Sequence, residues 1–529
     1  MSKKLSILLA LLLLALAVSP VSLAAPDANF NETGYPIVNE PITLSIMGPR
    51  NAAVFSPWSE NRVFQYMEKL TNIRFTYLDV DSNAWTEKLN LAFASGDLPD
   101  ILTKTSISNQ MLITNLEQGF ILPLNDLIGQ YAPNAQAAME RNPALKTLVT
   151  LPGGVIGGLF SESIVCSAES PLVPTTNFML YQPWLDGLGL AMPTNTQELY
   201  DVLKVFKEGD PNGNGKADEI PLSPLYGQTG LKDMMAFFGL PGGNSANFCE
   251  LDKETGKVVF LALEPEYKDF LAYFKTLYAE GLLDNDVFTQ NQQQVVAKGT
   301  DQDPLIGASV ASASFLVVGD ARAQAMVTAP IIQSPNGEKV WYRRPAGSSG
   351  TFVLTSLNKH PEASIRWADF FYTPEGAQIS WMGIEGEAWK WNEDGSWSFI
   401  LPEGVNQTQL RGYATLQPGG GNPAAFPTDW LKISDPSESF ATQQRALYLN
   451  DDPENQLVLA FPVVFYSDAD QKQVATYATD INSYVNQMMA RFITGEANLE
   501  TEWDAYEQTL KRMGLEDMIR IMQAACDAL

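Results

Sequence analysis

The chain has 529 residues, which exceeds the usual size of one hydrophobic core and predicts two or more lobes. Its formal net charge of −27 argues against nucleic acid or anionic lipid as partners, because both require a basic surface. The single histidine, His360, argues against Ser-His-Asp and Cys-His hydrolases and most zinc sites. A glycosidase needs only two carboxylates, so that class of enzyme stays open.

The first residues predict export. Lys3 and Lys4 precede an uncharged apolar run, Leu5 to Val18, that is too short to span a membrane comfortably. Small residues stand at the last and third-last positions before Ala25, as signal peptidase requires for cleavage after Ala24. We therefore interpret residues 1–24 as a removed signal peptide. The alternative is a retained membrane anchor. No later stretch is long and apolar enough to span a bilayer.

The next hundred residues alternate between strand and helix patterns. Strands are predicted at 42–47 and 73–78, with a helix between them whose apolar residues recur every three or four positions. An amphipathic helix at 85–94 and a short apolar strand at 101–102 follow. This alternation predicts an α/β lobe with a partly parallel sheet.

A second lobe is predicted to begin with the strand 177–181. Thr194 and Gln197 have the spacing of a capping box at the start of the next helix. The C-terminal quarter is predicted to be helical, and its tyrosines and methionines at helical spacing indicate core packing. The three cysteines, an odd number, cannot all pair. A Cys166–Cys249 disulfide and buried free thiols are both open.

The segment 210–221 has the pattern of a calcium-binding loop. Oxygen-bearing side chains stand at its first, third, fifth and ninth positions, and Gly215 stands at the sixth, where an EF-hand loop turns sharply. The backbone carbonyl of Lys216 would supply the seventh ligand. The twelfth position is Pro221, so Glu219 is the nearest candidate for the missing bidentate carboxylate. A metal-free Asp/Asn/Gly turn is the alternative. The loop side chains concerned are Asp210, Asn212, Asn214 and Asp218.

Several segments together resemble a family, the extracellular solute-binding proteins of carbohydrate ABC importers, and particularly the large oligosaccharide-binding branch that includes the alginate-binding proteins. The resemblance covers nearly the whole mature chain. It is carried by the order and spacing of six segments, namely Ala94–Ile101, Trp184–Leu190, Asp210–Pro221, His360–Glu362, Gly383–Gly386 and Phe492–Gly495.

The resemblance implies a periplasmic-binding-protein fold, with two α/β lobes and a ligand cleft between them. We expect an N-terminal lobe of residues 25–165 and 350–415 and a C-terminal lobe of residues 166–349 and 416–529. In that branch the matching loop binds structural Ca²⁺, which assigns as ligands Asp210, Asn212, Asn214, Lys216, Asp218 and Glu219. The partners that the resemblance implies are a carbohydrate, which in this branch is an oligosaccharide, and the permease subunits of the importer.

The sequence departs from the family pattern in two places. Ala24-Ala25-Pro26 lacks the lipid-modified cysteine that many relatives carry after the signal. Tyr181-Gln182-Pro183-Trp184 replaces the Arg-x-Asp-Trp common at that strand end. We therefore expect an exported, soluble, monomeric receptor in the periplasm or outside the cell.

Sugar sites combine stacked aromatic rings with short polar side chains, and six residues are candidates on that ground or from their place in the family. Trp58 follows the first strand, although a hydrophobic staple on the next helix explains it as well. Trp389 lies on a predicted hairpin whose aromatic face is explained equally by cross-strand packing. The full set is Trp58, Asp100, Trp381, Glu385, Trp389 and Trp430.

The sequence is compatible with three classes of function. The sequence favours a carbohydrate receptor for an ABC importer, which is not an enzyme. A secreted carbohydrate-active enzyme using two carboxylates, for example Glu385 and Asp100, is the main alternative. A calcium-dependent adhesion protein is disfavoured because the chain has no tandem β repeats.

Overall fold

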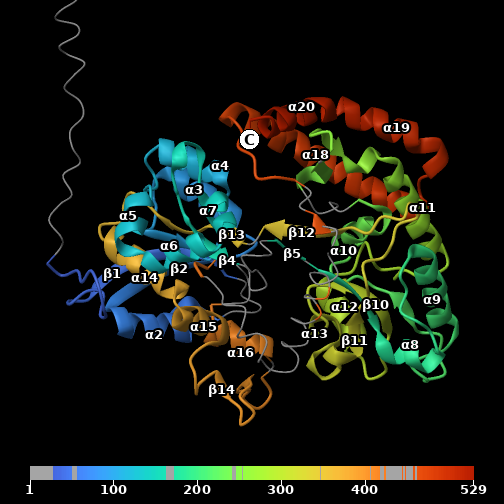
Figure 1. Cartoon of the computed structure of the whole chain (residues 1–529), viewed down its shortest axis with the longest axis horizontal. Coiled ribbons are helices and arrows are strands. Elements are labelled where there is room, and N and C mark those ends of the chain that lie inside the picture. The colour runs from blue at the N-terminus through green and yellow to red at the C-terminus, as the bar shows by residue number, and fades with distance from the viewer. Residues whose placement is uncertain are drawn as a thin grey trace, which may run out of the picture.

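The structure is a computed structural model that describes residues 28–50, 56–162, 172–174, 176–240, 246–252, 254–345, 347–405, 407–416, 422–424, 444, 447, 457–458 and 461–528. Within these residues the chain forms two α/β lobes, each built on its own sheet (Figure 1). The predicted signal peptide, Cys166 and Trp430 lie outside the described residues.

The N-terminal lobe is built on a five-stranded sheet with the order β2-β1-β3-β13-β4. β1 pairs in parallel with β2 and β3, whereas β13 is antiparallel to β3 and β4. This sheet is partly parallel, as the sequence predicts. Its strands are β1 (Ile42–Arg50), β2 (Ile73–Asp81), β3 (Ile101–Thr103), β4 (Leu159–Glu162) and β13 (Gly347–Leu354).

Helices surround this sheet on the left of Figure 1. They are α2 (Arg62–Thr71), α3 (Trp85–Ser95), α4 (Asn109–Glu117), α5 (Asn125–Tyr131), α6 (Pro133–Arg141), α7 (Pro143–Val149), α14 (Pro361–Asp369), α15 (Pro374–Met382) and α16 (Gln407–Ala414). α2 illustrates why the sequence folds this way: Asn61 caps its start by accepting from the Val63 and Phe64 amides, and its apolar stripe is buried. A hairpin of β14 (Trp389–Trp391) and β15 (Trp397–Phe399) extends the lobe.

The C-terminal lobe is built on a four-stranded sheet with the order β11-β6-β10-β7. Its strands are β6 (Asn177–Tyr181), β7 (Ile220–Leu222), β10 (Ile306–Ala311) and β11 (Met326–Thr328), with a separate hairpin of β8 (Cys249–Leu251) and β9 (Val258–Phe260). Its helices are α8 (Gln182–Leu188), α9 (Thr196–Glu208), α10 (Gln228–Asp233), α11 (Pro265–Ala279), α12 (Gln292–Gly299), α13 (Phe315–Val318), α18 (Asp468–Thr494), α19 (Leu499–Arg512) and α20 (Leu515–Cys526). One large core joins most of these helices to the sheet, and a smaller apolar cluster packs α12 and α13 against it.

A third sheet lies between the lobes. It pairs β12 (Trp341–Pro345) in antiparallel fashion with β5 (Leu172–Pro174) and in parallel with β16 (Leu457–Val458). Along the sequence, β5 follows β4 of the first lobe and precedes β6 of the second lobe. β12 precedes β13, which returns the chain to the first lobe. Figure 1 shows β5 and β12 between the two groups of helices.

Two described residues beyond α16 contact different lobes. Ala424 still bridges Ser161 on β4, whereas the side chain of Gln444 accepts a hydrogen bond from the amide of Thr328 on β11. Seven short 3₁₀ helices complete the described elements: Trp58–Glu60, Pro152–Gly154, Met234–Phe238, Ala246–Phe248, Leu261–Leu263, Asp320–Ala325 and Phe370–Tyr372.

One local prediction is wrong by a single residue. The N-cap of α9 is Asn195, which accepts from the Glu198 amide, and not Thr194. The Glu198 carboxylate instead accepts from both the amide and the hydroxyl of Thr194, each at 2.8 Å. Glutamate at the third helical position makes this arrangement stronger than the predicted Thr194–Gln197 pair, because a carboxylate is the better acceptor at a helix start.

Candidate ligand-binding site

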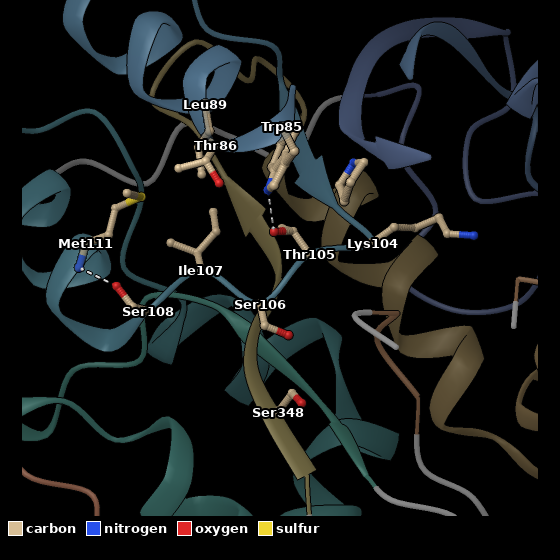
Figure 2. A pocket seen from close by; sticks show the side chains of 11 residues that line it. Trp85, Thr86, Leu89, Lys104, Thr105, Ser106, Ile107, Ser108, Met111 and Ser348 are labelled. Atoms are coloured by element: carbon tan, nitrogen blue, oxygen red, sulfur yellow. Dashed lines mark hydrogen bonds between the residues drawn. The ribbon is translucent and has the colours of Figure 1, made fainter. Parts of the chain in front are cut away.

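A pocket of about 570 Å³ lies in the N-terminal lobe, beyond the carboxyl ends of β1 and β3, where α3 and α4 approach each other (Figure 2). Ligands of open α/β sheets bind at this edge, because the loops that follow parallel strands meet there. The volume lies within the range of small-molecule sites. The lining residues are Pro49, Trp85, Thr86, Leu89, Lys104, Thr105, Ser106, Ile107, Ser108, Met111 and Ser348.

The polar side chains of the pocket follow directly from β3. Thr105, Ser106 and Ser108 come just after the last strand residue, Thr103. Figure 2 shows the indole nitrogen of Trp85 pointing at the Thr105 hydroxyl, to which it donates at 3.0 Å. Since this bond uses the only polar atom of the indole, a ligand would meet the apolar faces of the ring.

Lys104 is the only charged residue in the lining. Its side chain points away from the other labelled side chains in Figure 2 and donates to the Leu416 carbonyl at 3.0 Å. Burial lowers the pKa of Lys104 to about 7. The remaining lining offers hydroxyls, an indole and aliphatic groups, which is a neutral surface.

Trp58 lies beside this lysine but inside the core. Its side chain is 1% exposed, packs on Phe64 at 5.5 Å between ring centroids, and has the Lys104 Nζ 6.0 Å from its ring centroid. A Cβ on Gly48 would lie 2.8 Å from the Trp58 ring and 1.9 Å from the Thr103 carbonyl oxygen. The ring is therefore enclosed by α2 and β1.

The two candidate carboxylates occupy different places. Asp100 precedes β3, at the opposite end of that strand from the pocket, and its Oδ2 accepts from the amide and the hydroxyl of Ser45, both at 2.7 Å. It ties β1 to the start of β3. Glu385 is exposed in the turn after α15, where its backbone bridges Trp389.

The predicted tryptophan hairpin is present. Trp389 is buried, donates from Nε1 to the Gly383 carbonyl at 3.0 Å, and contacts Trp397 edge to face. Trp381 is half-buried, with the Arg411 guanidinium 4.0 Å from its ring centroid. These rings belong to one small apolar cluster with α15 and α16, and they do not line the pocket. Trp391 is the exposed ring of the hairpin.

Trp85, Thr105, Ser106, Ser108 and Ser348 were missed by the sequence reasoning. Trp85 looked like one more apolar residue of an amphipathic helix. The available signal was the run Lys104 to Ser106 directly after a short parallel strand, because polar residues at that position face the ligand edge of a sheet. Ser348 comes from β13, whose place next to β3 no local pattern reveals.

The loop 210–219 folds around its own oxygen atoms. The Asn214 amide donates to the Asp210 and Asn212 side chains at 3.1 and 3.0 Å, and the Lys216 amide donates to the Asn214 side chain at 2.8 Å. Gly215, at the sixth position, has φ +74°, which glycine adopts without steric cost. The side-chain amides of Asn212 and Asn214 both donate to Asp218.

Glu219 gives a direct test of whether these residues fit a cation. Its Oε1 is buried without a hydrogen-bond partner in the described structure. Burial raises the pKa of Glu219, and the negative charges of Asp218 and Asp210 raise it further. A carboxylate of this kind, next to two others, suits a hard cation. Across the described residues no group of three or more His, Cys, Asp and Glu side chains could hold a metal alone. The loop would also need its amide and carbonyl oxygens.

Comparisons with known proteins identify the family. The model of the family described as "Bacterial extracellular solute-binding protein" matches residues 56–378. The chain is 29% identical over 531 residues to the fructooligosaccharide ABC transporter substrate-binding protein FusA of Streptococcus pneumoniae, covering 98% of this chain and 96% of that protein.

Solved structures agree. FusA of S. pneumoniae in complex with kestose matches with a TM-score of 0.77 at 28% identity, covering 92% of this chain and 99% of that chain, and a FusA EF-hand mutant in complex with fructo-nystose matches equally well. The alginate-binding protein AlgQ2 without calcium ion shares the fold, with a TM-score of 0.73 at 24% identity over 95% of this chain and all of that one.

These matches confirm the predicted family resemblance and the two-lobed α/β fold. Among the described residues, no helix is both long and apolar enough to cross a bilayer. With a family model that spans well over half its length, the chain belongs to the bacterial extracellular solute-binding proteins.

Proposed function

We propose that this protein captures a neutral oligosaccharide outside the cytoplasm and delivers it to the permease of an ABC importer. The observation that carries the proposal is the pocket at the ends of β1 and β3, where one oriented tryptophan stands among hydroxyl side chains and the single lysine points elsewhere. Sugars offer apolar CH faces and many hydroxyls, which match this lining. The fructooligosaccharide receptor FusA supports the same class of ligand.

A receptor of this kind has to bind the sugar without converting it. Thr105, Ser106 and Ser108 supply hydroxyls that donate and accept, and Trp85 supplies a flat apolar face. The two carboxylates considered for hydrolysis lie on different elements, with Asp100 engaged by Ser45 and Glu385 exposed. Binding between two lobes joined by a narrow three-stranded sheet would allow closure around the sugar, and the permease would recognise the closed form.

The proposed division into lobes is supported by the sheets. The N-terminal lobe would hold the strands up to β4, together with β13 to about Ala424, and the C-terminal lobe would hold β6 to β11 and the chain from Gln444 on. The protein would be exported, lose residues 1–24 and act as a monomer. These parts of the proposal rest on the sequence of the leader and on the family.

Calcium is proposed as a structural ion of the loop 210–219. The side chains of Asp210, Asn212, Asn214, Asp218 and Glu219 would hold it, with the carbonyl of Lys216. The ion would offset most of the negative charge of three neighbouring carboxylates and tie α9 to β7, which the loop connects. The unpartnered Oε1 of Glu219 and the EF hand named for FusA support this assignment.

The experiment is calorimetric titration with neutral and acidic oligosaccharides. Wild-type protein should bind a neutral member, and Trp85→Ala should weaken that binding by about 10- to 100-fold, since a stacked ring contributes roughly 1–3 kcal/mol. Trp391→Ala is the matched control, because Trp391 is an exposed tryptophan that does not line the pocket. Equal loss in both variants, or preference for an acidic sugar, would contradict the proposal.

A further inference from the structure

A second cavity continues the candidate pocket between α3 and α4. It has a volume of about 410 Å³ and shares Ser108 and Met111 with the first pocket. On α3 the first pocket contacts Trp85, Thr86 and Leu89, and the second contacts the residues that follow on the same helix face. The full lining is Asn90, Phe93, Ala94, Ser108, Gln110, Met111, Thr114, Asn115, Gln118 and Gln471.

The two cavities therefore form one groove along α3. From Trp85 to Ala94 the helix advances by roughly 14 Å at about 1.5 Å per residue. That length exceeds one sugar ring and suits a chain of several. Met111 stands where the two cavities meet, and its flexible, unbranched side chain can rearrange as a ligand passes.

The second cavity carries no charged side chain. In the described structure the side-chain amides of Asn90, Gln118 and Gln471 make no hydrogen bond to protein. An amide presents both a donor and an acceptor, as a sugar hydroxyl does, and Phe93 adds an apolar wall. An acidic sugar would find no cation here, whereas a neutral one would find amides and a ring.

One of these amides comes from the other lobe. Gln471 lies in the first turn of α18, which packs in the core of the C-terminal lobe, while the rest of the lining comes from α3, α4 and the residues just before and after α4. Phe465, just before α18, packs against apolar residues of the N-terminal lobe. A ligand that reaches the second cavity would therefore touch both lobes.

We infer that the groove between α3 and α4 is an extended subsite for the distal units of a neutral oligosaccharide, and that Gln471 makes the protein favour longer chains by linking them to the second lobe. This inference rests on the proposed function of the first pocket. It adds the length and the charge of the ligand, and it assigns a role to α18.

The test is calorimetric titration with fructo-oligosaccharides of three, four and more units. Wild-type protein should bind longer chains more tightly than the trisaccharide. The double variant Gln118→Ala with Gln471→Ala should lose at least about tenfold in affinity for the longer chains, as expected for two lost hydrogen bonds, and less than twofold for the trisaccharide. Ala94→Trp, which fills only the second cavity, should have the same effect.

Leu91→Trp is the control for Ala94→Trp, because Leu91 is an exposed residue of α3 that lines neither cavity. It should leave every affinity unchanged. If the distal variants bind long chains as wild type does while Trp85→Ala loses binding, the extended subsite is refuted and the proposed function stands. If wild-type protein binds no fructo-oligosaccharide of any length, the proposed function fails and the inference fails with it.

Discussion

Replacing Lys104 by methionine should stabilise the protein in a pH-dependent way. The pKa of this buried lysine falls from 10.5 to about 7 because burial penalises the charged form. At about 1.4 kcal/mol for each pKa unit, the shift lowers the free energy of unfolding by about 5 kcal/mol at pH 7 and below. Methionine keeps the unbranched stem and removes this cost.

The substitution also has a cost of its own. It removes the hydrogen bond from Nζ to the Leu416 carbonyl, which contributes about 1 kcal/mol. The Leu416 carbonyl keeps a partner, since the Asn422 amide donates to it at 2.6 Å. The expected net gain in the free energy of unfolding is therefore about 4 kcal/mol at pH 7.

The sign of the pH dependence is fixed by the direction of the shift. Between pH 7 and pH 10.5 the unfolded chain holds a proton on Lys104 that the folded chain has released, so wild-type stability rises with pH in this window. The gain from Lys104→Met should accordingly fall to near zero by about pH 10.

Urea unfolding at pH 6, 8 and 10 measures this difference. The exposed Lys390→Met is the matched control, with the same change in charge and an expected effect within about 0.5 kcal/mol. A variant that is less stable than wild type at pH 7, or whose gain is equal at pH 6 and pH 10, would refute the reasoning.

Three further outcomes are expected. EDTA should lower the melting temperature and calcium should restore it, whereas Asp210→Ala should abolish the difference; a calcium-independent melting temperature in wild type would identify the loop as a simple turn. Gly48→Ala should lower the free energy of unfolding by about 1–3 kcal/mol or more, because its Cβ would overlap the Thr103 carbonyl and the Trp58 ring, and denaturant unfolding checks this. Burial raises the pKa of Asp369 to about 6, so the unfolded carboxyl ionises first and wild-type stability should fall as the pH rises from about 4 to about 6. Asp369→Asn should remove that fall. Urea unfolding curves of the two proteins that stay parallel across this pH range would contradict the assignment.

The sequence predicts the fold well where periodicity is strong. Helix α2 and strands β1 and β2 lie where the apolar spacing places them, and the stripe from Ile481 to Phe492 is buried along α18. The chain passages between lobes are harder to predict, because β5, β12 and β16 are short and pair only through tertiary contacts.

The ligand site is less accessible to sequence reasoning for a physical reason. Tryptophans attract attention as sugar platforms, yet Trp58 and Trp389 are among the most buried rings of the chain, since large apolar side chains are used first for packing. The neutral hydroxyl cluster after β3 has a plain sequence, and only the parallel pairing of β1 with β3 brings it to the ligand edge of the sheet. The six sugar-site residues predicted from sequence stay predictions.

The central claim is that this protein binds an oligosaccharide and does not transform it. Titration with a panel of neutral oligosaccharides, followed by chromatography of each sugar after long incubation, tests both halves in one experiment. The account predicts saturable one-to-one binding of at least one neutral oligosaccharide, with the sugar recovered intact. Catalytic conversion of the sugar into smaller products would contradict it.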